Sequence, residues 1–237
     1  MDIQIYQLLE GARQARGLTV IIDVFRAFSA ACYALEGGVA RIYPIGRQEE
    51  AYALKKDNPE FILVGERGGV MLPGFDYGNS PWQLQQAGRN GQLTGKTMVH
   101  TTSAGTQGIV GAQQADEIIT GSFVNAGAIA QYIRTKQPQH VSLVCMGLGG
   151  EEEADEDTLC AEWIKAELEG RPGDFDAVIR QLRDERRTGS FLDLVGEASA
   201  PEEDFGLCLA LNRFSFVLRA EREPGTDRLQ LVRVSAE

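Results

Sequence analysis

Two short segments of this sequence each place an acidic and a basic side chain close together. Asp23 precedes Arg26 by three residues, and Glu66 is followed directly by Arg67. Carboxylates are good ligands for a hard cation such as Mg²⁺, and an arginine can bind a phosphate or another oxyanion through two parallel hydrogen bonds. The pairs therefore predict chemistry on an anionic substrate. The plainer interpretations are that Asp23 caps a helix and that Arg67 forms a structural ion pair with Glu66 or Asp76.

A long segment rich in glycine and polar residues, 65–81, follows the apolar run Phe61–Val64. The pattern predicts a buried strand followed by a long loop, and loops of this length in compact domains are usually functional. Ser80 before Pro81 is typical of a helix start, where the free backbone N–H groups hold anions. We expect Asn79 and Ser80 to belong to such an anion site.

A hydroxyl-rich turn, 101–106, follows another apolar run. Its hydroxyls and backbone N–H groups can bind phosphate or sulfonate oxygens, although the same groups would equally cap the next helix. Asn125 has a comparable position after the following predicted strand. The predicted substrate-binding residues are Asn79, Ser80, Thr101, Thr102, Ser103, Gly105, Thr106 and Asn125.

An acidic run, 151–157, precedes a predicted helix. Acids are favourable at a helix N-terminus, and runs of charge are usually solvated, so Glu151–Glu153 are expected on the surface. Glu156 and Asp157 lie closer to the helix start and are better candidates for a metal ligand. Histidine ligands are not expected, because His100 is predicted to lie in the core and His140 on the surface.

Composition excludes several classes of protein. A net charge of −11 argues against nonspecific nucleic-acid binding. No segment has the apolar length of a membrane span or the pattern of a signal peptide, so we expect a cytoplasmic protein. The four cysteines have no paired spacing and are expected to be buried, reduced thiols.

Apolar runs alternate with helical periodicity as far as residue 168. Strands are expected at 18–24, 39–45, 61–64, 96–102, 117–120 and 140–146, and helices at 26–35, 47–56, 81–87, 104–113, 125–136 and 157–168. This alternation of unbroken apolar strands with helices predicts a three-layer α/β/α fold with a mainly parallel sheet. Ligands bind such sheets at the carboxyl ends of the strands, and five of these strands are followed there by acids, hydroxyls or an arginine.

The remainder, 170–237, is predicted to contain a helical stretch and a β-hairpin with strands 214–219 and 229–234. We expect one domain, 1–237, in which the subregion 170–237 packs on the sheet or forms a subunit contact. No residue in this subregion is assigned chemistry. A homodimer is expected on base rates alone.

Six motifs of the chain together resemble one enzyme family. In order, they are DVFRA (23–27), GERGG (65–69), GFDYGNSP (74–81), TTSAGT (101–106), GSFVNA (121–126) and EDTLCA (156–161). The set is similar to the 2-phosphosulfolactate phosphatase family of coenzyme M biosynthesis over nearly the whole chain. The resemblance implies an α/β/α fold, Mg²⁺ dependence, and hydrolysis of (R)-2-phospho-3-sulfolactate to 3-sulfolactate and phosphate. Ala104 stands where the family commonly has asparagine, and Phe25 and Phe28 where leucine and threonine are more frequent.

The working hypothesis is metal-assisted hydrolysis of a phosphate monoester. Asp23 would bind Mg²⁺ with Glu66 or Asp157, and Arg26 and Arg67 would clamp the anionic groups. The catalytic residues are thus Asp23, Arg26 and Arg67. Attack by water and formation of an aspartyl-phosphate both remain open. The alternatives are a phosphatase for another small phosphorylated acid, such as phospholactate or phosphoglycerate, and a non-enzymatic module that binds an anionic metabolite.

Overall fold

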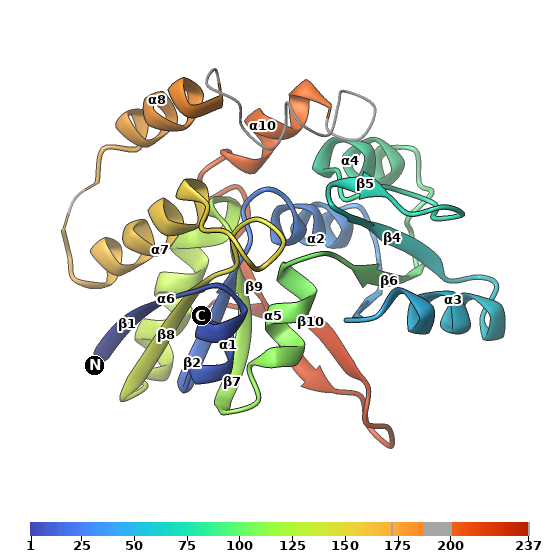
Figure 1. Ribbon diagram of the computed structural model, residues 1–237, viewed down its shortest axis with the longest axis horizontal. Helices are drawn as coiled ribbons and strands as arrows, with labels where there is room; N and C mark the ends of the chain where they lie inside the picture. Colours follow the sequence, from blue (N-terminus) through green and yellow to red (C-terminus); the bar gives the residue numbers. More distant parts are fainter. Residues whose placement is uncertain (172, 187–200, 237) are drawn as a thin grey trace.

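The computed structural model describes residues 1–171, 173–186 and 201–236, and the strands in this part of the chain form a single sheet (Figure 1). Their order across the sheet is β1-β8-β2-β7-β9-β10-β3-β6-β4-β5. The strand bounds are β1 Asp2–Gln7, β2 Gly17–Ile22, β3 Arg41–Pro44, β4 Ile62–Arg67, β5 Val70–Met71, β6 Thr97–Thr101, β7 Ala115–Gly121, β8 His140–Cys145, β9 Phe216–Arg222 and β10 Leu229–Ser235.

Helices cover both faces of the sheet. Their bounds are α1 Leu8–Gln14, α2 Ala27–Glu36, α3 Gln48–Asp57, α4 Pro81–Arg89, α5 Gly105–Gly111, α6 Ala126–Lys136, α7 Asp155–Leu168, α8 Phe175–Arg186 and α10 Glu202–Cys208, with a 3₁₀ turn η1 at Phe123–Asn125. Helices α1, α2, α4 and α5 share one apolar core, whereas α6 and α7 share a second and α3 lies on a third. Successive residues of a strand alternate between these cores: Ile21 belongs to the first, and Val20 and Ile22 to the second. The predicted α/β/α class is confirmed.

The elements expected between residues 18 and 168 are all present, and the largest difference is the end of β4 at Arg67 rather than at Val64. The prediction that the long loop starts at residue 65 is therefore wrong. Strand β4 turns at Gly68 and Gly69, with φ of 58° and 80°, and returns as β5. Two consecutive residues with positive φ are typical of a tight hairpin turn, which glycine adopts without strain. Consequently Glu66 and Arg67 lie on a strand, whose hydrogen bonds fix their backbone.

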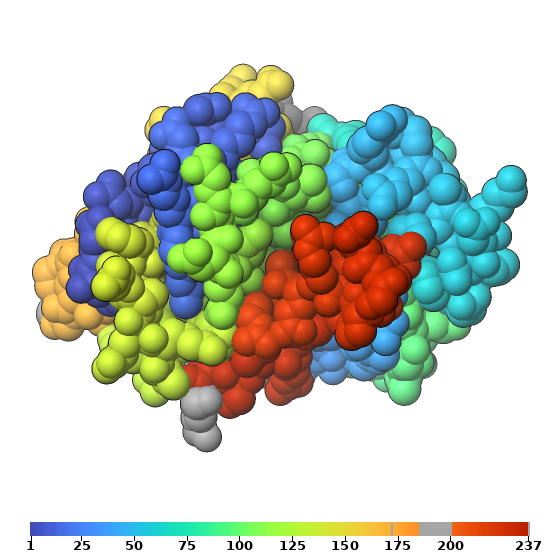
Figure 2. All heavy atoms as spheres, turned by 90° about the horizontal axis from the view of Figure 1, so that it is seen from below, coloured from blue at the N-terminus to red at the C-terminus, as the bar shows by residue number. Residues whose placement is uncertain are grey.

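The C-terminal hairpin lies inside the sheet. Strand β9 pairs antiparallel with β7, and β10 pairs antiparallel with β9 and meets β3 at Leu231 and Ile42. In Figure 2 the hairpin is the red band between the green segments and the blue to cyan segments. The expectation that 170–237 packs on the sheet or forms a subunit contact is thus wrong for the hairpin. Without the hairpin, β7 and β3 would each leave a row of buried backbone N–H and C=O groups without partners. The hairpin strands β9 and β10 form hydrogen bonds with these groups.

The hairpin separates two parallel groups of strands. Strands β1, β8, β2 and β7 form one group, and β3, β6 and β4 form the other. The three antiparallel pairings between the groups give them opposite senses in the sheet. A twist of about 20 to 25° per strand accumulates to about 100 to 125° over the five steps from β2 to β6. The groups therefore cross steeply, as Figure 1 shows, and the carboxyl ends of β2, β4 and β6 converge.

Several smaller expectations are also settled by the structure. All four cysteines are buried and free. Glu151–Glu153 are exposed, and His140 is exposed at the start of β8. The helical stretch expected from residue 170 contains α8 and α10, while positions 187–200 lie outside the described residues. Within the described part of the chain, none of the helices has the length and hydropathy needed to cross a membrane.

The N-terminal strand β1 and the helix α1 have no counterpart in the sequence-based prediction. Strand β1 is an edge strand that pairs only with β8 among the described strands. Its apolar residues Ile3 and Ile5 alternate with exposed Asp2 and Gln4, as is usual for a half-buried strand. Alternation was the signal that could have found it, whereas the prediction relied on unbroken apolar runs.

Candidate active site

The turn at 101–106 holds three of the predicted functional side chains. Thr101 Oγ1 accepts a hydrogen bond of 2.8 Å from an Nη2 of Arg67. Ser103 donates to Glu66 through its backbone N–H at 2.7 Å and its hydroxyl at 2.9 Å. Gly105 donates its backbone N–H to Asp23 Oδ2 at 2.9 Å. Donors that the sequence analysis assigned to a ligand are therefore directed at the protein's own acids.

Gly105 is required at its position by the closeness of Asp23. A Cβ there would lie 2.8 Å from Asp23 Oδ2, 2.8 Å from the Cβ of Ala27 and 3.1 Å from the ring of Phe28. Real Cβ atoms do not approach other atoms so closely in packed interiors. The turn and the first residues of α2 thus clamp the Asp23 carboxylate between them.

Asp23 and Glu66 form a close pair of buried carboxylates, each about 6% exposed. Burial raises the pKa of Asp23 to about 6, and the negative charge of Glu66 adds to this increase. Asp23 Oδ1 accepts from the N–H of Ala27 at 2.9 Å, and Glu66 Oε2 also accepts from the N–H of Gly69 at 2.6 Å. Two neighbouring carboxylates that repel each other are a favourable place for a cation.

The donor chemistry of this pair fits Mg²⁺. Each oxygen of Asp23 accepts one backbone N–H, and a carboxylate oxygen has about two acceptor positions, so both can still bind a cation. Mg²⁺ is usually held by one or two carboxylates, with waters and substrate oxygens completing its shell. No group of three or more histidine, cysteine, aspartate or glutamate side chains among the described residues is placed to hold a metal without such additions.

Asp157, the third predicted metal ligand, makes a different set of contacts. Its Oδ1 accepts from the N–H of Val24 at 2.8 Å, and its Oδ2 accepts from those of Met146 at 3.1 Å and Gly147 at 2.9 Å. Burial raises its pKa, and the charge of Asp23 raises it further, so the two acids are neighbours. Three backbone hydrogen bonds give Asp157 the role of joining the ends of β2 and β8. Its assignment as a metal ligand stays a prediction.

Arg67 lines an open depression of about 560 Å³. It donates to the carbonyl oxygen of Glu66 at 2.7 Å, to that of Gly46 at 3.0 Å and to Thr101. A guanidinium has five N–H donors, and the other two of Arg67 have no partner in the part of the chain that the structure describes. The alternative interpretation, an ion pair with Asp76, does not hold, because Asp76 pairs with Lys55. Arg67 is thus fixed in position with donors remaining for a ligand.

Arg26 lies deeper than predicted, with its side chain only 1% exposed. Its Nη1 donates to Asp204 Oδ2 at 2.8 Å, and Asp204 Oδ1 accepts from the hydroxyl of Ser80 at 2.8 Å and the N–H of Trp82 at 2.9 Å. The positive charge of Arg26 lowers the pKa of Asp23 slightly against its overall rise. In this geometry Arg26 joins Asp204 to the site and lowers the pKa of Asp23 through its charge. Direct contact of Arg26 with a substrate stays a prediction.

Asp204 is the residue that sequence reasoning missed. It belongs to α10, in the subregion to which no chemistry was assigned, and it joins Arg26 and the start of α4. In the sequence it is the third acid of Glu202–Asp204, which is indistinguishable from a solvated run at a helix start. Only its complete burial separates it from the exposed Glu202 and Glu203.

The other predicted binding residues are engaged within the fold. Thr102 and Thr106 cap each other, with each hydroxyl accepting from the other's backbone N–H. Asn125 Oδ1 accepts from the N–H of Ser122. Ser80 Oγ accepts from the N–H of Gln83, which confirms the predicted helix start. Of the predicted binding residues, only Ser103 lines the depression with Arg67.

His100 pairs with Asn79 in the core. The distance from its Nε2 to Asn79 Oδ1 is 3.0 Å, and burial lowers the pKa of the imidazole to about 3. The ring is therefore neutral at physiological pH, with Nε2 as the donor to Asn79. This confirms the expected core histidine and gives it no role as a general acid or base near neutral pH.

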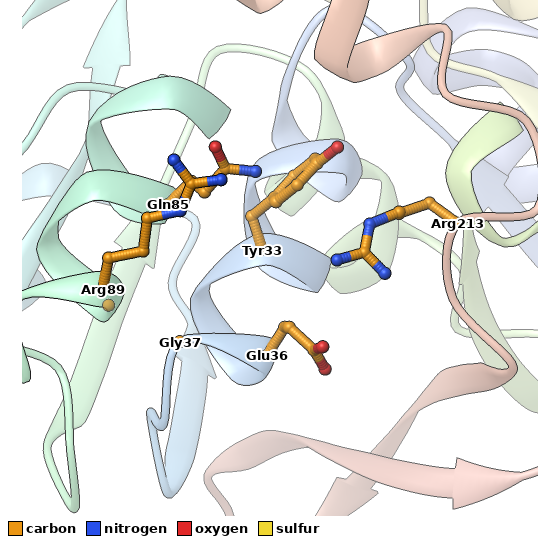
Figure 3. Close-up of a pocket in the computed structure, with 7 residues that line it drawn as sticks. Tyr33, Glu36, Gly37, Gln85, Arg89 and Arg213 are labelled. Carbon is orange, nitrogen blue, oxygen red and sulfur yellow. The ribbon is translucent and has the colours of Figure 1, made fainter.

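A second cavity, of about 250 Å³, lies between the C-terminal ends of α2 and α4 (Figure 3). Arg89 runs alongside Gln85 on one side of it, Arg213 reaches in from the other, and Tyr33 stands between them. The cavity also contains Glu36, and the ends of the two helices carry partial negative charge. Glu36 and the helix ends offset part of the charge of the two arginines, and this cavity is lined by only one carboxylate among the described residues, Glu36. The depression at Arg67 adjoins the pair Asp23 and Glu66, so it is the better candidate for a phosphate that is bound together with a cation.

Comparison with known proteins gives a consistent result. The family model described as 2-phosphosulpholactate phosphatase matches residues 3–223. A probable 2-phosphosulfolactate phosphatase of Bacillus subtilis is 35% identical over 172 residues, which cover 72% of each chain. Proteins of the same name from Symbiobacterium thermophilum and Caldanaerobacter subterraneus are 35% and 32% identical, over 75% and 84% of this chain and 76% and 85% of theirs.

Proposed function

We propose that this protein, which belongs to the 2-phosphosulfolactate phosphatase family, is a phosphoric monoester hydrolase that releases phosphate from 2-phospho-3-sulfolactate. One structural observation carries the proposal. The turn at 101–106 holds Asp23, Glu66 and Arg67 by direct hydrogen bonds, so that two buried carboxylates adjoin an arginine with unused donors. This is the combination that phosphoryl transfer requires: a cation site beside an oxyanion site.

Asp23 and Glu66 are the residues that would hold Mg²⁺. The metal, when bound, would neutralise the negative charge of the phosphoryl oxygens. Both carboxylates are held rigidly by backbone N–H groups, so no side chain needs to reorganise as charge develops on the substrate. Asp157 is assigned a structural role instead, because its three backbone hydrogen bonds join the ends of β2 and β8 and none of them comes from the turn at 101–106.

Arg67 would bind the phosphate through an N–H group that the fold leaves unused. Three other N–H groups fix the guanidinium plane against Glu66, Gly46 and Thr101. A guanidinium held in this way binds an oxyanion with little loss of side-chain entropy. With its pKa near 6, Asp23 is ionised at neutral pH and can act as a metal ligand or as a nucleophile.

Two alternatives differ in what they require of the site. A phosphatase for another small phosphorylated acid would use the same three residues, so only turnover separates it from the proposal. A non-enzymatic anion-binding module would have no use for two buried carboxylates beside its arginine, since they repel an anion. The nearness of Asp23 and Glu66 to Arg67 therefore favours an enzyme.

The test is phosphate release from 2-phosphosulfolactate, phospholactate, phosphoglycerate and para-nitrophenyl phosphate, with Mg²⁺ and with EDTA. We expect Mg²⁺-dependent turnover with the highest kcat/KM for 2-phosphosulfolactate. Preferential turnover of another of the four compounds would show that the protein is a phosphatase with a different substrate. Absence of turnover for all four, with folded protein and added Mg²⁺, would contradict the proposal.

A further inference from the structure

The depression at Arg67 contains a second arginine that the sequence analysis did not single out. Arg47 immediately precedes α3, and its side chain is 82% exposed. The residues that line the depression come from three places in the chain: the start of α3, the end of β4, and the turn that leads into α5. They are Gly46, Arg47, Gln48, Glu49, Arg67, Ser103 and Gln107.

The backbone next to Arg47 is fixed relative to Arg67. The carbonyl oxygen of Gly46 accepts from an Nη2 of Arg67 at 3.0 Å and from Nε2 of Gln107 at 2.5 Å. Gln107 also donates to the carbonyl of Thr102 at 3.1 Å, which ties the start of α3 to the turn at 101–106. One carbonyl thus connects Arg67 directly to the residue before Arg47, and the two arginines line the same depression.

The side chain of Arg47 is held only weakly. Its Nε lies 3.6 Å from Glu49 Oε2, and the Glu49 side chain is itself 65% exposed. Exposed pairs of this kind contribute little, because water screens the charges and ordering two long side chains costs entropy. Arg47 can therefore exchange Glu49 for a stronger anionic partner.

A multiply charged substrate has a particular need for such a residue. With a net charge of −11, the protein as a whole repels anions. Phosphate bound at Arg67 satisfies that arginine, so a second acidic group on the same molecule needs another cation.

We propose that Arg47 binds the second acidic group of the substrate, a sulfonate or carboxylate, when its phosphate is bound at Arg67. This inference rests on the proposed function and specifies the substrate class as small acids that carry at least one further anionic group.

The experiment compares kcat/KM for 2-phosphosulfolactate and for para-nitrophenyl phosphate, which has no second acid, in the wild type and in Arg47→Ala. The ratio of the two values is expected to fall about tenfold, mainly through a higher KM for 2-phosphosulfolactate, as for loss of one charge-assisted hydrogen bond. Glu49→Gln should act in the opposite direction and lower that KM about twofold, because it removes the competing partner of Arg47. Arg89→Ala, an arginine at the other cavity, is the matched control and should leave the ratio unchanged.

If kcat/KM in Arg47→Ala stays the same for both substrates, or falls by the same factor for both, the ratio is unchanged and the assignment of Arg47 is overturned. Failure of the proposed function is a separate result, namely that the wild type releases phosphate from neither substrate. In that event 2-phosphosulfolactate is not consumed, and its calorimetric binding to the wild type and to Arg47→Ala tests the residue directly. Binding that is about tenfold weaker in the variant would support the assignment, and equal or absent binding would overturn it.

Discussion

The depression at Arg67 and the cavity between α2 and α4 each contain two arginines, but they differ in what surrounds them. Arg67 lies next to Glu66 at the end of β4, where the turn at 101–106 joins it to the buried carboxylates of Glu66 and Asp23, and Arg47 lines the same depression. Arg89 and Arg213 lie at the C-terminal ends of helices together with Glu36. Surface arginines alone therefore do not mark a catalytic site in this fold. The distinguishing feature is the buried acid pair, held by a turn that joins it to Arg67.

The largest effect should come from the buried pair. Asp23→Asn removes the carboxylate without changing its size, and we expect kcat to fall by about 10³-fold or more while the protein stays folded. The measurement is phosphate release, with circular dichroism to confirm the fold. Asp157→Asn serves as the comparison: both variants lose a backbone hydrogen bond, which should lower the free energy of unfolding by about 1 to 3 kcal/mol, but only Asp23→Asn should lose this much of kcat. Full activity in Asp23→Asn would break the distinction between the two regions.

Arg67→Ala should have the next largest effect, about a 10²-fold loss in kcat/KM, because the variant loses its charge-assisted hydrogen bonds to the phosphate. Arg67→Lys keeps the charge but cannot reproduce the planar fork of three contacts to Glu66, Gly46 and Thr101. We expect it to recover only part of the loss. Steady-state kinetics of the two variants would measure this, and a lysine variant as active as wild type would show that only the charge matters.

Mg²⁺ should stabilise the protein in a pH-dependent manner. Without metal, the folded pKa of Asp23 is about 6 and lies above its ordinary value of 3.8, so this group's contribution to stability is lost as pH rises from about 4 through 6. A cation binds the ionised form, so Mg²⁺ should raise Tm more at pH 7.5 than at pH 5. At 100 times its Kd the increase should be about 5 to 10 °C. Thermal scans would contradict the account if the increase were equal at both pH values or persisted in Asp23→Asn.

The smallest effect is expected at the second cavity. Arg89→Ala removes an exposed side chain that forms no ion pair within the described residues, and it should change kcat/KM by less than about twofold. A tenfold or larger loss, measured with the same substrates, would mean that this cavity takes part in the reaction. The contrast between the two depressions would then no longer hold.

The fold class and the positions of the main acids follow from local patterns. Unbroken apolar runs alternating with helices give the α/β/α arrangement, and Asp23 and Glu66 come together because each ends a strand or lies near its end. The role of the 101–106 turn could not be read in the same way. A hydroxyl or N–H group has the same sequence signal whether it binds a ligand or, as Ser103 does, a carboxylate of the protein itself.

The features that sequence reasoning missed depend on contacts between distant residues. Asp204 is bonded to Arg26 across 178 positions, and no periodicity links the two. The same holds for the C-terminal hairpin, whose strands pair with β7 and β3 near the middle and the beginning of the chain. Local patterns identify a hairpin, but its place in a sheet depends on which edges the rest of the fold leaves open.

A crystal structure with Mn²⁺ in place of Mg²⁺, and with phosphate, would decide whether Asp23 and Glu66 hold the metal, because anomalous scattering locates Mn²⁺ without ambiguity. We expect the metal at about 2.1 Å from carboxylate oxygens of Asp23 and Glu66, with phosphate bound to Arg67. A metal held by Glu151–Glu153, or phosphate bound between Arg89 and Arg213 instead, would contradict this expectation.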